Sequence, residues 1–402
     1  MSSSEPEFND AREYSSLEEV MNTLLTAKGK SFRELDQTGR ALTGGNKGSL
    51  GQIIEESVLK YAINSDAAPD IHIGDTSYEL KVTPLKHIKK GKQTSAKERL
   101  VIDIINYLTL ADETDFESSK MWDKAKNIIL VYYYDDRTDK KKELRIDCKV
   151  LASYLMKYEA DDLATIKNDW HVIRDKVASG HADSLSESDT NYLAACTKGA
   201  NSKQLREAPA PAGANTATIF AKQRAFSLKT SYMTAIARKL LNRKSETVRL
   251  PIPQEQNLDE YVAAKFIPYT GKSSRDIASE LQVSAAPTAK NYNSSLAFAM
   301  LGASKSSISK IEQFSKANIS QFKSVTIYPD GLPREHMSFK AITDDQWEEW
   351  ANPQTTWEQS FVRDFFETSK FLIMVSKSPI PYQSGHDKAK DIFQRCIPLE
   401  YA

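Results

Sequence analysis

The stretch that most constrains this chain runs over residues 68–81 and reads APDIHIGDTSYELK. Polar and apolar side chains alternate along residues 77–82, which predicts a β-strand with Glu79 and Lys81 together on one face and apolar side chains on the other. A second short β-like run begins at Asp70, and the glycine-containing turn between the two runs predicts a hairpin. The hairpin would bring Asp70 back beside Glu79.

Two neighbouring carboxylates with a lysine suit the hydrolysis of a phosphodiester. Mg²⁺ takes oxygen ligands and keeps bound waters, one of which can serve as the nucleophile, and we expect Mn²⁺ to be able to replace it. A nearby ammonium can polarise that water or stabilise negative charge on a phosphate. Alone, however, this Asp-x8-Glu-x-Lys pattern is more often an ordinary solvated strand face, so its interpretation depends on the rest of the chain.

Composition limits the class of protein. The 402 residues, of which 40% are hydrophobic, are enough for two or three domains with proper cores. Lys+Arg and Asp+Glu are balanced at 54 each, so a nucleic-acid surface has to come from local clustering. The three cysteines are far apart and odd in number, which argues against a disulfide framework and favours the reducing cytoplasm. The polar first residues lead us to expect no signal peptide, and we find no apolar run long enough to span a membrane.

Residues 49–61 have the periodicity of an amphipathic helix. Its buried stripe would consist of Leu50, Ile54, Val58 and Tyr61.

Two acids follow one another in this helix. Glu55 lies at the edge of the stripe and would be half-buried at the rim of a site, whereas Glu56 lies well outside the stripe. An ordinary surface acid remains the plain alternative for Glu55.

Other segments predict further elements. We expect a helix over residues 17–25, a capping box at Ser31 and Glu34, a central strand over residues 127–134, and helical structure over residues 150–195. Residues 100–108 are apolar and fit either a buried helix or a strand. The glycine-rich residues 43–48 lack the spacing of a nucleotide P-loop, which excludes ATP binding there.

Two basic regions are candidate DNA contacts. Residues 81–99 carry a run of lysines that suits phosphates, although a soluble loop is the simpler interpretation of such a run. Residues 222–244 hold seven basic residues and no acid, with Phe226 and Tyr232 interleaved. Such a segment can lie along DNA and read base edges, and an amphipathic surface helix explains it about equally well.

The second half of the chain repeats features of the first. The proline-containing stretch 245–259 is the best domain boundary. Beyond it, Gly271-Lys-Ser-Ser-Arg-Asp-Ile277 mirrors Gly29-Lys-Ser-Phe-Arg-Glu-Leu35. Two diverged copies of one fold are the economical interpretation, with domains at residues 1–244 and 245–402.

These motifs together resemble the MutH and Sau-type family of GATC endonucleases within the PD-(D/E)xK superfamily. The resemblance covers about residues 17–244 and rests, in order, on Lys47-Gly48 ahead of Glu55, Pro69-Asp70, Glu79-Leu-Lys81-Val-Thr-Pro84, Lys97-Glu-Arg-Leu100, Phe116-Glu-Ser-Ser with Lys124, and the segment Arg224–Thr234. The two-copy length is similar to that of the Sau-type restriction enzymes rather than the shorter repair nickase.

The resemblance implies an α/β fold in which two tandem MutH-like domains each have a mixed central sheet flanked by helices, the second copy being degenerate. It implies Mg²⁺-dependent hydrolysis of double-stranded DNA at 5′-GATC-3′, with the cut 5′ of the G and dimerisation on DNA. Asp70 and Glu79 would be metal ligands, Lys81 the catalytic lysine, Glu55 an additional helix carboxylate and Lys124 a second active-site lysine. One extra residue between Glu55 and Asp70 leaves Glu56 as an alternative. The expected DNA contacts are Lys47, Lys86, Lys89, Lys97, Arg224, Lys229, Ser231 and Tyr232.

Three activities are weighed against one another. The leading one is a type II restriction endonuclease that cuts both strands. A strand-specific GATC nickase of mismatch repair is the second, and a non-catalytic GATC-binding module is the third.

The second half is expected to lack chemistry. Aligning the repeats puts Phe298 in the place of Glu55, Gln321-Phe-Lys323 in the place of Glu79-Leu-Lys81, Phe365 in the place of Lys124, and Gln313-Phe314 near Asp70-Ile71. An uncharged set of this kind cannot hold Mg²⁺. We therefore expect this half to bind DNA or pair subunits and so to regulate the first half, with a purely structural role as the alternative.

Overall fold

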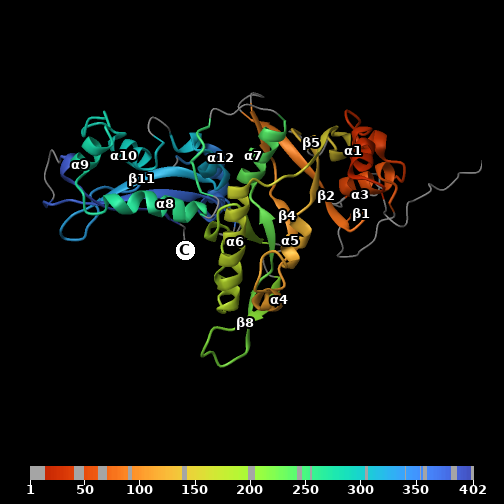
Figure 1. Cartoon of the computed structure of the whole chain (residues 1–402), viewed down its shortest axis with the longest axis horizontal. Helices are drawn as coiled ribbons and strands as arrows, with labels where there is room; N and C mark the ends of the chain where they lie inside the picture. Colours follow the sequence, from red (N-terminus) through yellow and green to blue (C-terminus); the bar gives the residue numbers. More distant parts are fainter. Residues whose placement is uncertain are drawn as a thin grey trace, which may run out of the picture. The chain divides into compact units, whose positions relative to one another are not determined.

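The computed structural model of the chain describes residues 14–39, 49–61, 70–88, 93–137, 143–197, 204–241, 247–253, 256–303, 307–339, 341–353, 355, 360–381 and 387–399 (Figure 1). They fall into two compact units that are interleaved along the sequence. Unit 1 comprises Met1–Asp103, Glu113–Tyr158 and Phe226–Lys244, and unit 2 comprises Ile104–Asp112, Glu159–Ala225 and Ser245–Ala402. No helix within the described ranges is long and apolar enough to cross a membrane.

Unit 1 is built on a mixed sheet. Its strands are β1 (Ile71–Ile73), β2 (Thr76–Ile88), β5 (Ile128–Tyr134) and β6 (Val150–Leu155), in that order, with β3 (Gln93–Ala96) paired to β2. Strands β2 and β5 are parallel, and the other pairs are antiparallel. Strand β5 is buried along nearly its whole length, as the central strand of a sheet covered on both faces must be. The predicted mixed sheet and the predicted strand over residues 127–134 are confirmed for this unit.

Short helices surround this sheet. They are α1 (Leu17–Leu25), α2 (Phe32–Leu35), α3 (Ser49–Ile53) continued by the π-helical turn η2 (Ile54–Val58), α5 (Lys120–Ala125), the 3₁₀ turn η3 (Arg145–Asp147) and α7 (Thr230–Leu240).

Helix positions follow the local sequence signals in unit 1. Ser31 accepts a hydrogen bond from the Glu34 backbone N–H while the Glu34 carboxylate accepts one from the Ser31 N–H, so the predicted capping box is present. Helix α1 occupies the predicted range 17–25. The predicted stripe of residues 49–61 lies in one hydrophobic cluster with residues of α1, β2 and β5.

Unit 2 contains a second, smaller sheet of strands β11 (Ile319–Ile327), β12 (Lys370–Lys377) and β13 (Ile392–Leu399). Strands β11 and β12 are parallel, and β13 is antiparallel to β12. A separate hairpin is made of β8 (Leu205–Pro209) and β9 (Thr218–Lys222), and β7 (Leu193–Thr197) also lies in this unit.

The helices of unit 2 are α4 (Tyr107–Asp112), α6 (Ala160–Ala178), α8 (Leu258–Phe266), α9 (Ser274–Glu280), α10 (Tyr292–Met300), α11 (Glu312–Lys316), α12 (Asp344–Ala351) and α13 (Phe361–Thr368). Its 3₁₀ turns are η4 (Ala182–Ser184), η5 (Glu187–Asp189), η6 (Ile267–Tyr269), η7 (Ile308–Lys310) and η9 (Lys388–Lys390). Strands β4 (Leu100–Ile104) and β10 (Arg224–Leu228) each contain a junction between the units.

Two expectations about local structure need correction. The range 150–195 is not helical throughout, because its two ends are the strands β6 and β7 and only α6 between them is a long helix. The run 81–99 is not a loop where it is described, because β2 continues to Ile88 and β3 follows.

The predicted boundary between residues 244 and 245 coincides with one of the places where the chain passes from unit 1 to unit 2. Unit 2 also takes in residues 104–112 and 159–225, which precede that boundary in the sequence. The division into domains at residues 1–244 and 245–402 therefore stays a prediction about the sequence repeat.

Candidate active site

The β1–β2 hairpin carries the first candidate carboxylate. Ile71 pairs with Tyr78, so Asp70, one residue before β1, comes to lie next to the start of the Glu-x-Lys run. The Asp70 Oδ2 atom accepts a hydrogen bond of 2.8 Å from the backbone N–H of Leu80. This bond fixes the carboxylate of Asp70 against the strand that carries Glu79, as the hairpin interpretation predicts.

Glu79 and Lys81 form the second part of the site. Lys81 Nζ donates to Glu79 Oε1 over 2.6 Å, and the two side chains are 24% and 10% exposed. The backbone N–H of Glu79 donates to the Asn127 carbonyl, which anchors the strand to the start of β5. The intervening Leu80 belongs to the hydrophobic cluster of unit 1, so the predicted division of the two strand faces is confirmed.

Glu55 lies in the π-helical turn η2 and is half-buried, as expected. Glu56, however, is only 4% exposed, and its Oε2 atom lies 3.4 Å from the Thr38 hydroxyl oxygen. The expectation that Glu56 lies outside the buried stripe is therefore wrong. A π-helical turn advances by more residues per turn than an α-helix and rotates this residue inward. Such turns are frequent at functional sites.

Lys124 is held by an acid that the sequence patterns did not single out. Its Nζ lies 3.0 Å from Asp103 Oδ1, and Lys120 Nζ lies 3.4 Å from Asp103 Oδ2. Lys124 is near the end of α5, and α5 leads directly into β5, the partner of β2. Asp103 is the one acid in the otherwise apolar run 100–104, and that isolated charge could have indicated it.

The donor chemistry of Asp70 and Glu79 fits a hard divalent cation. Among the residues whose placement is described, no group of three or more His, Cys, Asp or Glu side chains is arranged to hold a metal ion. Mg²⁺ does not need such a group, because it usually binds through one or two carboxylates with waters and substrate phosphates. Asp70, just before β1, and Glu79, in the paired strand β2, supply two such carboxylates.

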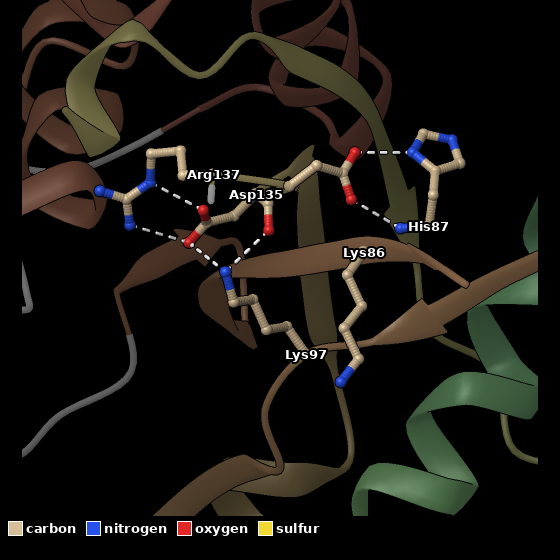
Figure 2. A pocket seen from close by; sticks show the side chains of 6 residues that line it. Lys86, His87, Lys97, Asp135 and Arg137 are labelled. Atoms are coloured by element: carbon tan, nitrogen blue, oxygen red, sulfur yellow. Dashed lines mark hydrogen bonds and ion pairs between the residues drawn. The ribbon is translucent and has the colours of Figure 1, made fainter. Parts of the chain in front are cut away.

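The expected phosphate contacts Lys86 and Lys97 both line a pocket of about 560 Å³ at the far end of β2 (Figure 2). Lys97 lies 3.0 Å from Asp135, which is 3% exposed, and Arg137 binds the same carboxylate through Nε over 2.7 Å. Lys86 is exposed and, in Figure 2, extends away from these ion pairs. Lys97 therefore stabilises the pocket wall, while Lys86 is open to solvent.

Burial of Asp135 opposes its ionisation, but hydrogen bonds from Arg137 and Lys97 outweigh that effect and hold the pKa of the carboxyl well below its ordinary value. On the other side of the pocket His87 Nδ1 lies 2.6 Å from Asp136 Oδ2, and the His87 ring stacks on Tyr134. The sequence patterns missed this acidic and basic turn after β5.

The basic segment 222–244 divides into β10 and α7. Arg224, Lys229 and Tyr232 are all buried, whereas Ser231 is half-buried. The guanidinium of Arg224 donates from one terminal nitrogen to the carbonyl of Ala195 over 2.8 Å. The segment is therefore an integral part of the fold and not an appended surface helix.

Three expected features lie outside the described residues. They are the DNA contacts Lys47 and Lys89 and the glycine-rich residues 43–48.

A mixed sheet that presents an Asp, a Glu-x-Lys run and a helix acid has the arrangement of a PD-(D/E)xK nuclease. A family model described as "DNA mismatch repair enzyme MutH" matches residues 59–169. The chain is 34% identical over 401 residues to the type II restriction enzyme Sau3AI of Staphylococcus aureus. The aligned region covers 96% of this chain and 77% of that enzyme. It is also 26% identical over 225 residues to the DNA mismatch repair protein MutH of Shewanella woodyi (strain ATCC 51908 / MS32), covering 55% of this chain and 90% of that protein. The chain belongs to the MutH-related family of type II restriction endonucleases, which are site-specific deoxyribonucleases.

Proposed function

We propose that this enzyme hydrolyses both strands of double-stranded DNA at 5′-GATC-3′, 5′ of the G, in a Mg²⁺-dependent reaction. The observation that carries the proposal is the placement of Asp70 against the strand of Glu79 and Lys81. The similarity to a type II restriction enzyme over nearly the whole chain favours double-strand cleavage.

Each residue of the site has a role in this proposal. Asp70 and Glu79 would hold the cation through carboxylate oxygens, with Glu55 as an additional carboxylate at the rim. A bound cation supplies Lewis-acid activation of water and neutralises charge on the phosphate. The ammonium of Lys81, now paired with Glu79, would stabilise negative charge that develops on the phosphate oxygens. Lys124, oriented by Asp103, would supply a second positive charge.

DNA contact is proposed for the residues of the expected set that solvent can reach. Lys86 is exposed at its pocket and suits a phosphate. Ser231, half-buried at the start of α7, suits a base or phosphate contact. We propose that residues 224–234, the reading segment, recognise GATC, and that the buried Arg224, Lys229 and Tyr232 hold this segment in place within the fold.

The second half is proposed to be a degenerate copy of the first. Strands β11, β12 and β13 have the order and directions of β2, β5 and β6. The middle strands of the two sheets are β5 and β12. The pairing of β5 with β6 is irregular after Tyr132, and the pairing of β12 with β13 is irregular after Val375.

Aligning the middle strands on that irregularity tests the proposed correspondence residue by residue. Glu79 pairs with Ile128, and at the matching place Gln321 pairs with Phe371. Two residues further along, Lys81 pairs with Leu130 and Lys323 pairs with Ile373. The register thus supports the replacement of Glu-Leu-Lys by Gln-Phe-Lys.

The mirrored glycine motifs also occupy matching places. The backbone N–H of Gly29 donates to the carbonyl of Val150 in β6, and the N–H of Gly271 donates to the carbonyl of Phe393 in β13, both over 2.8 Å. Both glycines have φ near +80°, a conformation that other residues rarely adopt. This agreement supports a common ancestry of the two halves.

The matching site in unit 2 is apolar. Phe298, expected in the place of Glu55, lies with its ring centroid 5.8 Å from that of Phe322. Phe365, expected in the place of Lys124, packs against Phe371. One expected correspondence is not supported: Gln313 lies in helix α11 and exchanges hydrogen bonds with the backbone of Leu250, whereas Asp70 immediately precedes strand β1.

An amide and two phenyl rings cannot replace the carboxylates that Mg²⁺ requires. We therefore assign DNA binding and subunit pairing on DNA, and no chemistry, to residues 245–402. A strand-specific nickase, the second candidate, has no need for this second half.

The test is incubation of supercoiled plasmids with full-length protein and Mg²⁺. Linear fragments with GATC at their ends are expected, and faster cutting of a plasmid with two GATC sites than of one with a single site is expected from pairing on DNA. Nicked circles alone would favour the nickase, and retarded but intact DNA would favour a binding module. Equal rates on the two plasmids would refute the regulatory role of the second half.

A further inference from the structure

Helix α6 and strand β7 are joined by one buried carboxylate. Asp169 is fully buried, and it accepts hydrogen bonds from the backbone N–H groups of Asn191, Tyr192 and Leu193 over 2.8, 2.6 and 2.9 Å. Hydrogen bonds to an ionised acceptor are short and strong. Asp169 therefore fixes where β7 begins.

The side chain of Asn191 connects this point to the second half. It is fully buried, donates through Nδ2 to Asp259 Oδ2 of α8 over 2.7 Å, and accepts at Oδ1 from Lys370 Nζ over 3.0 Å. Lys370 is the first residue of β12 and is itself fully buried. A buried amide that uses both its donor and its acceptor has one fixed orientation.

The other end of β7 leads to the DNA-reading segment. The carbonyl of Ala195 accepts the hydrogen bond from Arg224, which is 4% exposed and opens β10. Arg224 also anchors the chain through its own carbonyl, which accepts from the N–H of Ile105 over 2.9 Å. A buried guanidinium committed to a backbone carbonyl positions the segment that follows it.

We propose that Lys370, Asp259, Asn191 and Arg224 are positioning residues that form a polar relay from the second half to the reading segment. The relay runs from β12 and α8 through Asn191 to β7 and from Ala195 to the start of β10. It rests on the proposed function, in which residues 224–234 read GATC. When the relay is intact, it holds the reading segment in one position. Loss of a contact lets that position vary, which lowers the discrimination between GATC and other sites.

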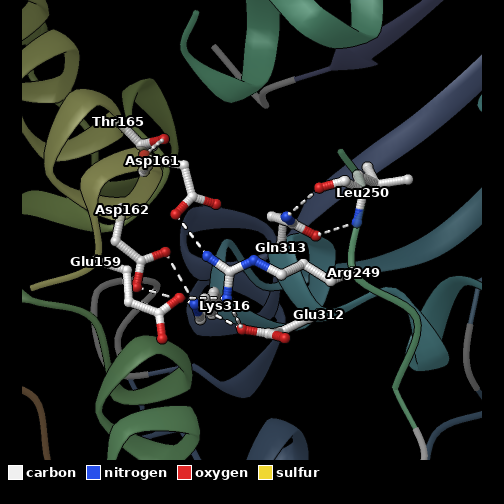
Figure 3. Close-up of polar contacts among 9 residues, drawn as sticks. All are labelled: Glu159, Asp161, Asp162, Thr165, Arg249, Leu250, Glu312, Gln313 and Lys316. Carbon is white, nitrogen blue, oxygen red and sulfur yellow. Dashed lines mark hydrogen bonds and ion pairs between the residues drawn. The ribbon is translucent and has the colours of Figure 1, made fainter. Parts of the chain in front are cut away.

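The same unit offers a matched control. Lys316 is 4% exposed and binds Asp162 and Glu312, each over 2.8 Å, next to Arg249, which bridges Asp161 and Glu312 (Figure 3). This cluster also joins the start of α6 to the second half, but it contacts neither Asn191 nor β7 through any of these pairs. Lys316→Met removes a buried lysine without cutting the relay.

The experiment compares full-length wild-type protein with Lys370→Met, Asp259→Asn and Lys316→Met. Cleavage kinetics are measured on duplexes with GATC and with one changed base pair, and thermal melting is followed in parallel. Lys370→Met is expected to lower the ratio of cognate to changed-site kcat/KM roughly 3- to 30-fold, the range typical of coupling through such contacts. Asp259→Asn is expected to act in the same direction, and Lys316→Met to lower the melting temperature without changing the ratio.

A second readout does not depend on cleavage. Hydrogen exchange of the backbone amides of residues 219–228 is expected to rise in Lys370→Met and to stay at the wild-type level in Lys316→Met. Equal behaviour of the two lysine variants in both readouts, or an unchanged ratio with unchanged exchange in Lys370→Met, would overturn the relay. If Lys370→Met does not fold, the same outcomes are judged on Asp259→Asn. A wild-type protein that does not cut GATC would refute the proposed function, and the exchange data would still decide on the relay.

Discussion

Strands β2 and β11 run through the two sheets in the same direction relative to their neighbours, yet only one carries a pair of opposite charges. In β2, Glu79 and Lys81 face each other across 2.6 Å. In β11 the matching residues are Gln321 and Lys323, and Lys323 donates to the carbonyl of Ser338 and lies over the ring of Phe339. The sheet is maintained by backbone pairing and apolar neighbours, so a single carboxylate can be lost without loss of the fold.

The ends of the middle strands differ in the same way. The N–H of Asp135 donates to the carbonyl of Leu85, and the N–H of Ser378 donates to the carbonyl of Ile327 at the matching place, over 2.8 and 2.9 Å. Asp135 is surrounded by Lys97 and Arg137, whereas the Ser378 hydroxyl donates to a nearby backbone carbonyl. Unit 1 thus carries a carboxylate at two places where unit 2 has an amide or a hydroxyl, namely Gln321 and Ser378.

The largest expected effect separates the two lysines. Lys81→Ala is expected to lower kcat on a single-site GATC duplex roughly 100- to 1,000-fold, because a positive charge that stabilises the transition state is lost. Lys323→Ala is expected to change kcat less than about two-fold, since this half-buried lysine donates to the carbonyl of Ser338 in the half to which no chemistry is assigned. Single-turnover cleavage measures both. Comparable losses in both variants would break the distinction between the halves.

Stability is expected to depend on charge at the end of β5. Asp135→Asn removes the partner of two cations in a buried setting and is expected to cost about 3–5 kcal/mol. Ser378→Ala is expected to cost about 1 kcal/mol, as for an ordinary hydrogen bond. Asp136→Asn, which affects only the exposed pair with His87, serves as the control within unit 1 with a cost of about 0–1 kcal/mol. Urea unfolding of the three variants measures these losses of stability. A loss for Asp135→Asn that is smaller than the losses for the other two variants would contradict this expectation.

The pH dependence of unit 1 follows from the same carboxyl. The pKa of Asp135 in the folded protein lies below its ordinary value of 3.8, so its contribution to stability is present above pH 3.8 and is lost as pH falls below that value. The free energy of unfolding, measured by chemical denaturation from about pH 5 to about pH 3, is expected to decline less for Asp135→Asn than for wild type. Parallel declines would show that other groups govern acid unfolding.

The sequence predicted the parts that depend on local periodicity. The alternation around Glu79, the stripe from Leu50 to Tyr61 and the capping box of Ser31 all appear as expected, because each is set by neighbours within a few residues. The π-helical turn that buries Glu56 was missed, because the periodicity argument assumes α-helical geometry along the whole of residues 49–61.

Contacts between distant segments were equally out of reach. Asp103 at Lys124, Asp169 at the start of β7 and Lys370 at Asn191 join residues far apart in the sequence. The sequence does not distinguish a buried arginine from an exposed one, and the expectation that Arg224 contacts DNA rested on the family resemblance. Only the fold reveals that its partner is a backbone carbonyl.

Metal affinity tests the central claim most directly. Mn²⁺ binding to the full-length protein on a GATC duplex, followed by electron paramagnetic resonance, is expected to weaken at least about ten-fold in Glu79→Gln, because a neutral amide replaces a carboxylate ligand. The matching variant Gln321→Ala is expected to bind Mn²⁺ and cleave as wild type does. Unchanged Mn²⁺ binding and cleavage in Glu79→Gln, or loss of both in Gln321→Ala, would contradict the assignment of all metal chemistry to the first half.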